Sequence, residues 1–166
     1  MKKYVISILV QNQPGVTRRV SGLFSRRGYN IESISSGTTN DEGTSRLTVV
    51  VNGDEHILDQ IIKQVNKLID VIRVDQLHSA TSVQRELMLV KVNTPPAVRG
   101  ELMELCKIFD ARVVDVCTES VILEVCGDRG KIKAFLENLK PYNIIETVRT
   151  GLTALTRGKE KFEAVM

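Results

Sequence analysis

Residues 9–34 read LVQNQPGVTRRVSGLFSRRGYNIESI, and this stretch decides the fold. An apolar run ends at Asn12, and a Pro14-Gly15 turn follows it. The next apolar residues keep the i, i+4, i+7 and i+8 spacing of one helical face: Val16, Val20, Leu23 and Phe24. Gly28 is the residue type expected just after a helix C-terminus, and another strand begins beside Asn30. The stretch therefore predicts a strand, a turn, a helix and a second strand.

The pattern continues to residue 77. Residues 45–51, SRLTVVV, alternate apolar side chains as a half-buried strand does, and the turn-rich residues 38–44 precede them. A second amphipathic helix follows Asp54, and residues 70–77 read as a fourth strand. The order strand, helix, strand, strand, helix, strand is that of a ferredoxin-like βαββαβ unit.

The same order returns after a polar stretch. A shift of 82 residues lays Val16 on Val98 and Leu23 on Leu105, and a shift of 74 lays Asp54 on Asp128. We therefore predict an α+β chain with two ferredoxin-like domains in tandem. The expected boundaries are a first domain over 1–78, a linker over 79–84, a second domain over 85–150 and a C-terminal tail over 151–166.

Each such unit leaves one sheet face without helices. Strand segments that are apolar on both faces, LTVVV (47–51) and VILEV (121–125), suggest that this face or a sheet edge is buried against another surface. Self-association is the simplest explanation, so we expect an oligomer.

Composition excludes several classes of protein. The chain has 166 residues, 42% hydrophobic and 26% charged, and its net charge of +3 comes from scattered charges of both signs. This composition indicates a globular protein and gives no reason to expect a nucleic-acid partner. No apolar run approaches the ~20 residues of a membrane span, so we expect a cytoplasmic protein. The three cysteines, Cys106, Cys117 and Cys126, have apolar neighbours and are expected to be buried free thiols.

The residues that carry chemistry are few. His56 and His78 have no second His or Cys at ligand spacing, so no metal site is expected. No nucleophile motif is present, and an enzyme hidden in the second copy would have only Asp115, Glu119 and Glu124 to use. We therefore expect no catalytic site.

The Pro14-Gly15 turn is the strongest candidate for a binding site. Proline at i+1 and glycine at i+2 suit a type II turn, which leaves the first amides of the following helix free for an anion the size of a carboxylate. The Asn12 amide oxygen could accept from an ammonium group, so the loop would suit a free amino acid. A plain turn, with Asn12 bonded to its own loop, remains an alternative. The second copy has Pro95-Pro96 here and has lost this feature.

Residues 8–34 and the junction DVIRVDQL and RELMLVKV resemble the small regulatory subunit of acetohydroxyacid synthase, also called acetolactate synthase. The similarity covers essentially the full length, including TGLTALTRGKEKF near the C-terminus, and the segment SRRGYNIES is specific to this family among ACT domains.

The resemblance implies a regulator without an active site of its own. It would bind and activate the catalytic subunit, a transferase that carries thiamine diphosphate, FAD and Mg²⁺, and confer feedback inhibition by valine or another branched-chain amino acid. No cofactor is expected on this chain. A free-standing ACT regulator of another target is the alternative.

The resemblance also implies a homodimer through the ACT domains, with effectors at the seam between two chains. The implied effector-binding residues are Asn12, Gln13, Pro14, Gly15, Val16, Asn30 and Ile31, and Leu9 is a possible pocket wall. The candidate contacts to the catalytic subunit are Arg18, Arg19, Arg26 and Arg27.

Overall fold

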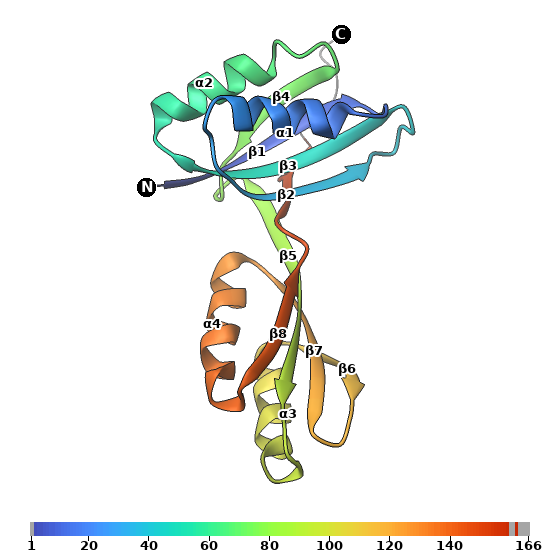
Figure 1. Cartoon of the computed structure of the whole chain (residues 1–166), viewed down its shortest axis with the longest axis vertical. Helices are drawn as coiled ribbons and strands as arrows, with labels where there is room; N and C mark the ends of the chain where they lie inside the picture. The colour runs from blue at the N-terminus through green and yellow to red at the C-terminus, as the bar shows by residue number, and fades with distance from the viewer. Residues whose placement is uncertain (1, 160–161, 163–166) are drawn as a thin grey trace. The chain divides into compact units, whose positions relative to one another are not determined.

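The computed structural model describes residues 2–159 and 162, which divide into two compact units (Figure 1). The N-terminal unit comprises the chain up to Gln84 together with residues from Leu152 onward. The C-terminal unit comprises Arg85–Gly151. The chain therefore passes from one unit to the other twice.

Two of these features differ from the predicted linker and tail. Strand β5 (Ser82–Asn93) begins inside the linker expected over 79–84. The expected tail contains strand β9 (Thr153–Thr156), which pairs with β5. The polar composition of the first stretch suggested a linker, but the backbones of the two stretches gain ladder hydrogen bonds from each other.

The N-terminal unit is an antiparallel sheet with two helices on one face (Figure 1). The strand order is β2-β3-β1-β4, so β2 and β4 are the edge strands. Alternate β1 residues, including Ile6 and Ile8, pack with helix residues such as Phe24 and Ile61 in a core between sheet and helices. The elements are β1 (Lys2–Gln11), α1 (Val16–Arg26), β2 (Ile31–Thr38), β3 (Thr44–Gly53), α2 (Glu55–Val65) and β4 (Val71–Leu77).

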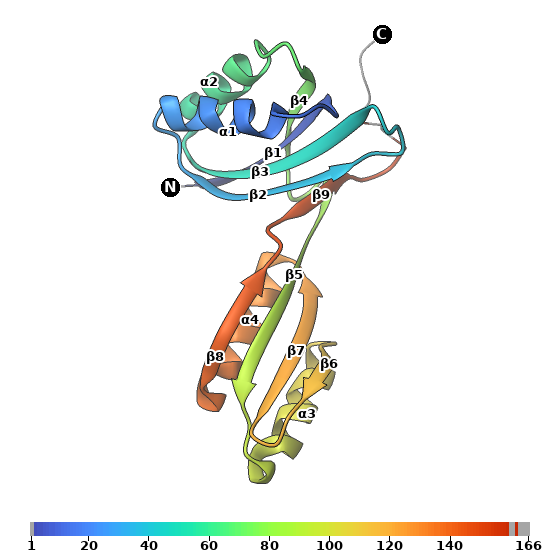
Figure 2. The same cartoon turned by 45° about the vertical axis from the view of Figure 1, so that its right-hand side comes forward.

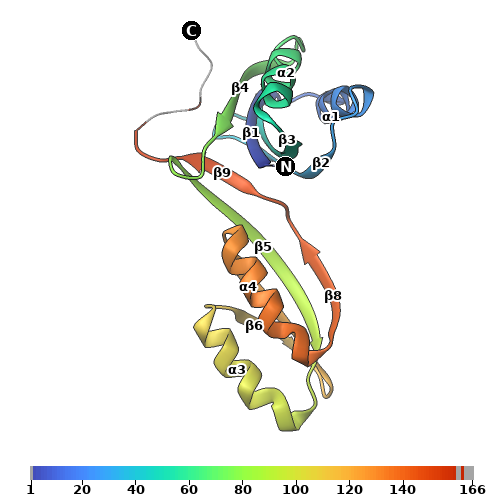
Figure 3. The same ribbon diagram turned by 90° about the vertical axis from the view of Figure 1, so that its left-hand side faces the viewer.

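The C-terminal unit repeats this order with its own core. Figure 2 shows β8, β5, β7 and β6 side by side, and Figure 3 shows α3 and α4 together on one side of them. The core includes the fully buried Phe135, whose ring centroid lies 5.2 Å from that of Phe109. The elements are β5, the 3₁₀ turn η1 (Pro96–Val98), α3 (Arg99–Ile108), β6 (Arg112–Val116), β7 (Ser120–Gly127), α4 (Arg129–Leu139), the 3₁₀ turn η2 (Lys140–Tyr142) and β8 (Ile144–Arg149). The predicted pair of ferredoxin-like domains is confirmed.

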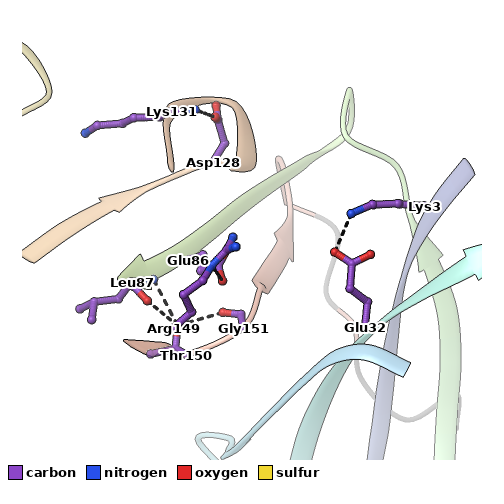
Figure 4. A network of polar contacts seen from close by, with 9 residues as sticks. All are labelled: Lys3, Glu32, Glu86, Leu87, Asp128, Lys131, Arg149, Thr150 and Gly151. Carbon is purple, nitrogen blue, oxygen red and sulfur yellow. Dashed lines mark hydrogen bonds and ion pairs between the residues drawn. The ribbon is translucent and has the colours of Figure 1, made fainter. Parts of the chain in front are cut away.

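A partly buried ion pair joins the first and last strands of the C-terminal unit (Figure 4). Arg149 donates from Nε and Nη2 to the two carboxylate oxygens of Glu86, at 2.7 and 2.6 Å. The Glu86 side chain is almost fully buried, so the forked guanidinium supplies the hydrogen bonds that water would otherwise give it.

Helix α1 ends in a Schellman motif. The amide of Tyr29 donates to Phe24 O at 3.0 Å, the amide of Gly28 donates to Ser25 O at 3.1 Å, and Gly28 has φ +70°. The Tyr29 ring packs edge-on against Phe24, with 6.4 Å between ring centroids. This turn places Asn30 directly before β2.

Helix α3 ends in the same motif without glycine. The amides of Ala111 and Asp110 donate to Cys106 O at 2.8 Å and to Lys107 O at 3.2 Å. Asp110 has φ +49°, a conformation that an L residue adopts at a cost. The residue with positive φ after the helix is thus a glycine in the first copy and an aspartate in the second.

We expect exchanging these two cap residues to move stability in opposite directions. Asp110→Gly should stabilise the C-terminal unit by about 0.5–1 kcal/mol, because it removes the strain of positive φ. Gly28→Asp should destabilise the N-terminal unit by a similar amount. A Cβ at Gly28 would have no heavy atom within 4 Å, so conformational strain is the expected cause. Urea unfolding of each variant measures the change, with Asp110→Asn as the control for charge.

Part of the bare face of the N-terminal sheet is covered by the chain itself. Leu152 and Ala154 are buried with Val5, Val50 and Leu77 on the side away from α1 and α2. Self-association is therefore not needed to bury these residues. The C-terminal unit differs, because exposed apolar side chains lie on both its edge strands: Val114, Val116, Ile145 and Val148.

Only one of the three cysteines is buried as expected. Cys106 lies in the C-terminal core, and burial raises the pKa of its thiol. The expectation is wrong for Cys117 and Cys126, which are exposed free thiols. Cys126 alternates with the buried Val125 on β7, and Cys117 follows the end of β6, so apolar neighbours in sequence did not imply burial.

Candidate effector site

The loop between β1 and α1 has the predicted turn conformation. Gly15 has φ +85° and ψ −7°, and the amide of Val16 donates to Gln13 O at 3.4 Å. These values fit position i+2 and the closing hydrogen bond of a type II turn. Gly15 is the N-cap residue of α1, and no side chain caps the helix there. The N-terminus of α1 therefore presents backbone donors beside an exposed glycine.

Asn12 is bonded to the β2–β3 hairpin of its own chain. Its backbone amide donates to Gly43 O at 2.8 Å, and its side-chain Nδ2 donates to Glu42 O at 2.9 Å. Its Oδ1 accepts a hydrogen bond from Ser45 Oγ at 3.0 Å. This is close to the alternative in which Asn12 stabilises its own loop. A side-chain amide has two donors and two acceptor positions, so each atom still has one for a ligand.

Arg19 fastens α1 to the chain segment before β4. Its Nε and Nη2 donate to the two carboxylate oxygens of Asp70 at 2.6 and 2.9 Å, and this hydrogen bonding raises the pKa of Arg19. The backbone carbonyl of Asp70, a buried residue, accepts from the amide of Gln11 at 2.9 Å. Arg19 is thus linked through Asp70 to Gln11, the residue before the loop.

The four candidate contact arginines are consequently not equivalent. Arg27 Nη2 donates to Gln64 Oε1 at 3.2 Å, which ties α1 to α2. Arg18 and Arg26 are exposed. Among the described residues, neither side chain is joined to α2 or to Asp70 as Arg27 and Arg19 are. The surface of α1 that remains for a partner is centred on these two side chains.

Asn30 and the Asn12 loop lie at opposite ends of the sheet. The last β1 residue, Gln11, pairs with Thr44, whereas the first β2 residue, Ile31, pairs with Val51. These two β3 positions are seven residues apart along the strand, or roughly 24 Å at ~3.4 Å per residue. One small ligand could not contact both ends within one chain.

The three apolar residues expected around the ligand also face different surroundings. Val16 lies in the core beneath α1, and Ile31 packs at the edge of that core. Leu9 points to the opposite face of the sheet, where it lines a pocket of about 350 Å³ together with Arg46, Ile72 and Phe162. Leu9 therefore does not share a wall with Val16.

The corresponding loop of the C-terminal unit is filled by an arginine. The amide of Thr94 donates to Glu119 O at 2.8 Å, which repeats the Asn12 to Gly43 bond. Arg99 Nη2 then contacts the carbonyls of Thr94, Cys117 and Thr118 at 3.3, 2.8 and 3.0 Å. Sequence reasoning missed Arg99, whose only signal was its place one turn after Pro95-Pro96. In the second loop, the Arg99 side chain thus bonds to loop carbonyls where, among the described residues, the first loop has no such arginine.

The fold and this loop define a class of protein: a chain with an N-terminal ACT domain, whose β1–α1 loop offers backbone donors, followed by a second ferredoxin-like domain. Residues 6–73 match the model of the acetohydroxyacid synthase small subunit-like ACT domain, and residues 85–158 match the model of the small subunit of acetolactate synthase.

Relatives agree over nearly the full length. The probable acetolactate synthase small subunit of Archaeoglobus fulgidus is 50% identical, over 96% of this chain and 99% of its own. The small subunit of Mycolicibacterium smegmatis is 44% identical, over 93% of this chain and 91% of its own. The crystal structure of the Thermotoga maritima small subunit has a TM-score of 0.88 and 38% identity, over 96% and 100% of the two chains. The chain belongs to the acetolactate synthase small-subunit family, which confirms the resemblance.

Membership of this family implies a catalytic subunit as partner. It also makes this chain a regulatory component of acetolactate synthase. Within residues 2–159 and 162, every helix is too short or too polar to cross a membrane.

Proposed function

We propose that this chain binds the catalytic subunit of acetolactate synthase, raises its activity and makes it sensitive to feedback inhibition by valine or another branched-chain amino acid. The catalytic subunit would condense two pyruvates, or pyruvate with 2-oxobutyrate, with its own thiamine diphosphate, FAD and Mg²⁺. This chain would bind the effector and none of these cofactors. Its family supports the partner, and the β1–α1 loop supports the effector.

The observation that carries the effector proposal is the uncapped N-terminus of α1 behind Gly15. The free amides and the helix dipole favour the effector carboxylate. Asn12, held in place by Glu42 and Ser45, would accept from the ammonium group through its remaining lone pair. A zwitterionic amino acid would therefore bind the helix amides through its carboxylate and Asn12 through its ammonium group.

The second half of the site would come from a second copy. Ile31 begins the edge strand β2 and Asn30 precedes it, about seven residues along the sheet from the Asn12 loop. Two copies joined antiparallel along β2 would bring Asn30 of one toward the loop of the other. This arrangement forms a homodimer with two effector sites.

Inhibition then requires that the effector bind two arrangements of the subunits with different affinities. An effector that bridges two copies can inhibit only if it binds more tightly to the arrangement in which the catalytic subunit is less active. Arg18 and Arg26, on the free surface of α1, are the candidates for catalytic-subunit contact. Helix α1 begins at the effector loop, so it could transmit the change.

The test is the activity of purified catalytic subunit with and without this chain, titrated with valine, leucine and isoleucine. We expect activation by the chain and inhibition by at least one of the three amino acids. One methylene is worth ~0.8 kcal/mol, so discrimination between valine and its two larger homologues, leucine and isoleucine, should be roughly fourfold or more. Failure of the folded chain to bind or activate the catalytic subunit would favour a free-standing regulator of another target.

A further inference from the structure

Phe162 is clamped between two arginines on the face of the N-terminal sheet away from the helices. The guanidinium carbons of Arg46 and Arg73 lie 5.0 and 4.8 Å from the centre of its ring. Arg46 Nη2 also donates to the Phe162 carbonyl at 3.1 Å, and Arg73 is held by Asp75 at 2.6 Å. The ring is buried, with 9% of the residue exposed. Cation–π contacts of this kind strengthen when the ring excludes water.

The residues before Phe162 are attached to the same face. Strand β9 pairs with β5, and the amide of Arg157 donates to Thr81 O at 2.8 Å. Ser35 Oγ donates to Leu152 O at 2.8 Å, which reaches the edge strand β2. We call residues 152–159 together with Phe162 the C-terminal latch.

The seated latch leaves one donor unsatisfied. Arg46 Nε is buried, and among the described residues it has no hydrogen-bond partner. Burial also lowers the pKa of Arg46, which shows that the seat is unfavourable for its charge. An unpaired buried donor is unfavourable, and this cost offsets part of the attraction that holds Phe162 on Arg46. The seated state is therefore suited to reversible release.

The seat of the latch and the effector loop share the β2–β3 hairpin. Ser45 donates to Asn12, and its neighbour Arg46 holds Phe162. A pocket of about 350 Å³ adjoins the seat: Phe162 and Arg46 line it together with hairpin residues such as Thr44. A shift of Phe162 would thus act on the strand segment that fixes Asn12.

We propose that the C-terminal latch is a releasable clamp on the ACT domain, anchored by Phe162 between Arg46 and Arg73, whose seating sets the position of the hairpin that holds Asn12. Its role in effector sensing rests on the proposed function, whereas the clamp and its link to the hairpin do not. The site between Arg46 and Arg73 therefore accepts an extended chain segment that carries an aromatic side chain.

Hydrogen–deuterium exchange of the full chain, without any amino acid added, tests the clamp. We expect Phe162→Ala to speed the exchange of β9 and Arg157 amides at least tenfold, and Phe162→Tyr to preserve the slow rate because it keeps the aromatic face. Phe162→Leu keeps an apolar side chain without that face and should exchange nearly as fast as the alanine variant. Unchanged exchange in Phe162→Ala, or a leucine variant equal to the native chain, would overturn the clamp.

The same experiment tests the link to the hairpin. The Asn12 and Thr44 amides, which donate to Gly43 O and Asp41 O, should also exchange faster in Phe162→Ala. Amides of α2, on the other side of the sheet, serve as the control for intact folding and should not change. A latch that opens while the Asn12 and Thr44 amides stay protected would disprove the link. Neither readout needs effector binding, so a failure of valine to bind would count against the proposed function alone.

Discussion

Gly15→Asp should weaken effector binding by about 100-fold while the ACT domain stays folded. A carboxylate at this position would occupy the N-terminus of α1 and repel the carboxylate of the amino acid, and loss of charge-assisted hydrogen bonds costs about 1.5–3 kcal/mol. Folding should survive because aspartate tolerates positive φ better than most residues. The nearest atom to a Cβ at Gly15 is the Arg19 Nη1, at 3.2 Å and at the end of a flexible side chain.

Titration calorimetry with valine on Gly15→Asp and Gly15→Asn separates charge from shape. Asparagine has nearly the same size and also tolerates positive φ, so we expect a smaller loss of affinity than with aspartate. Asn12→Ala should weaken binding as well, because it removes the acceptor for the ammonium group. Native affinity in all three variants would show that this loop is only a structural turn.

Phe135→Ala should unfold the C-terminal unit at a much lower urea concentration and leave effector binding intact. Phe135 is fully buried in the core of that unit, and truncation of a buried phenylalanine costs about 3–5 kcal/mol. The core of the N-terminal unit is a separate cluster that includes Phe24. We therefore expect two unfolding transitions in the variant, and activation of the catalytic subunit then shows whether the C-terminal unit is needed for it.

The matched variant is Phe24→Ala, which removes a fully buried ring from the other core. It should abolish effector binding and spare the C-terminal unit. Hydrogen exchange of α2 and α4 reports the two units separately. A single transition that carries both units together in each variant would show that they fold as one cooperative structure.

The helices and strands were largely predictable because their signals are local. The spacing of Val16, Val20, Leu23 and Phe24 marks α1, and all four are buried. Gly28 was expected after the helix because the Schellman motif needs positive φ, and it has φ +70°. Strand β9 was not predicted, since four residues with two threonines resemble irregular chain until β5 provides a partner.

The candidate site was predictable only in its backbone. Pro14 and Gly15 predict the turn type by themselves, because each restricts or permits a particular φ. The partners of Asn12 come from residues about 30 positions away, and the partner of Arg19 lies 51 positions away, so no local pattern indicates them. The different surroundings of Leu9 and Val16 follow from strand pleat and helix placement, which the spacing of two residues does not reveal.

The distance between the Asn12 loop and Asn30 has a consequence for how this protein would respond to its effector. A ligand that contacts the loop of one chain and the start of β2 in another is bound by a pair of molecules, so saturation depends on subunit concentration as well as on effector concentration. At low abundance the effector would first have to stabilise the pair, and its apparent affinity would fall. Feedback through such a site would be strongest when the cell has made much of the regulatory subunit, which links the sensitivity of the pathway to the expression of its own sensor.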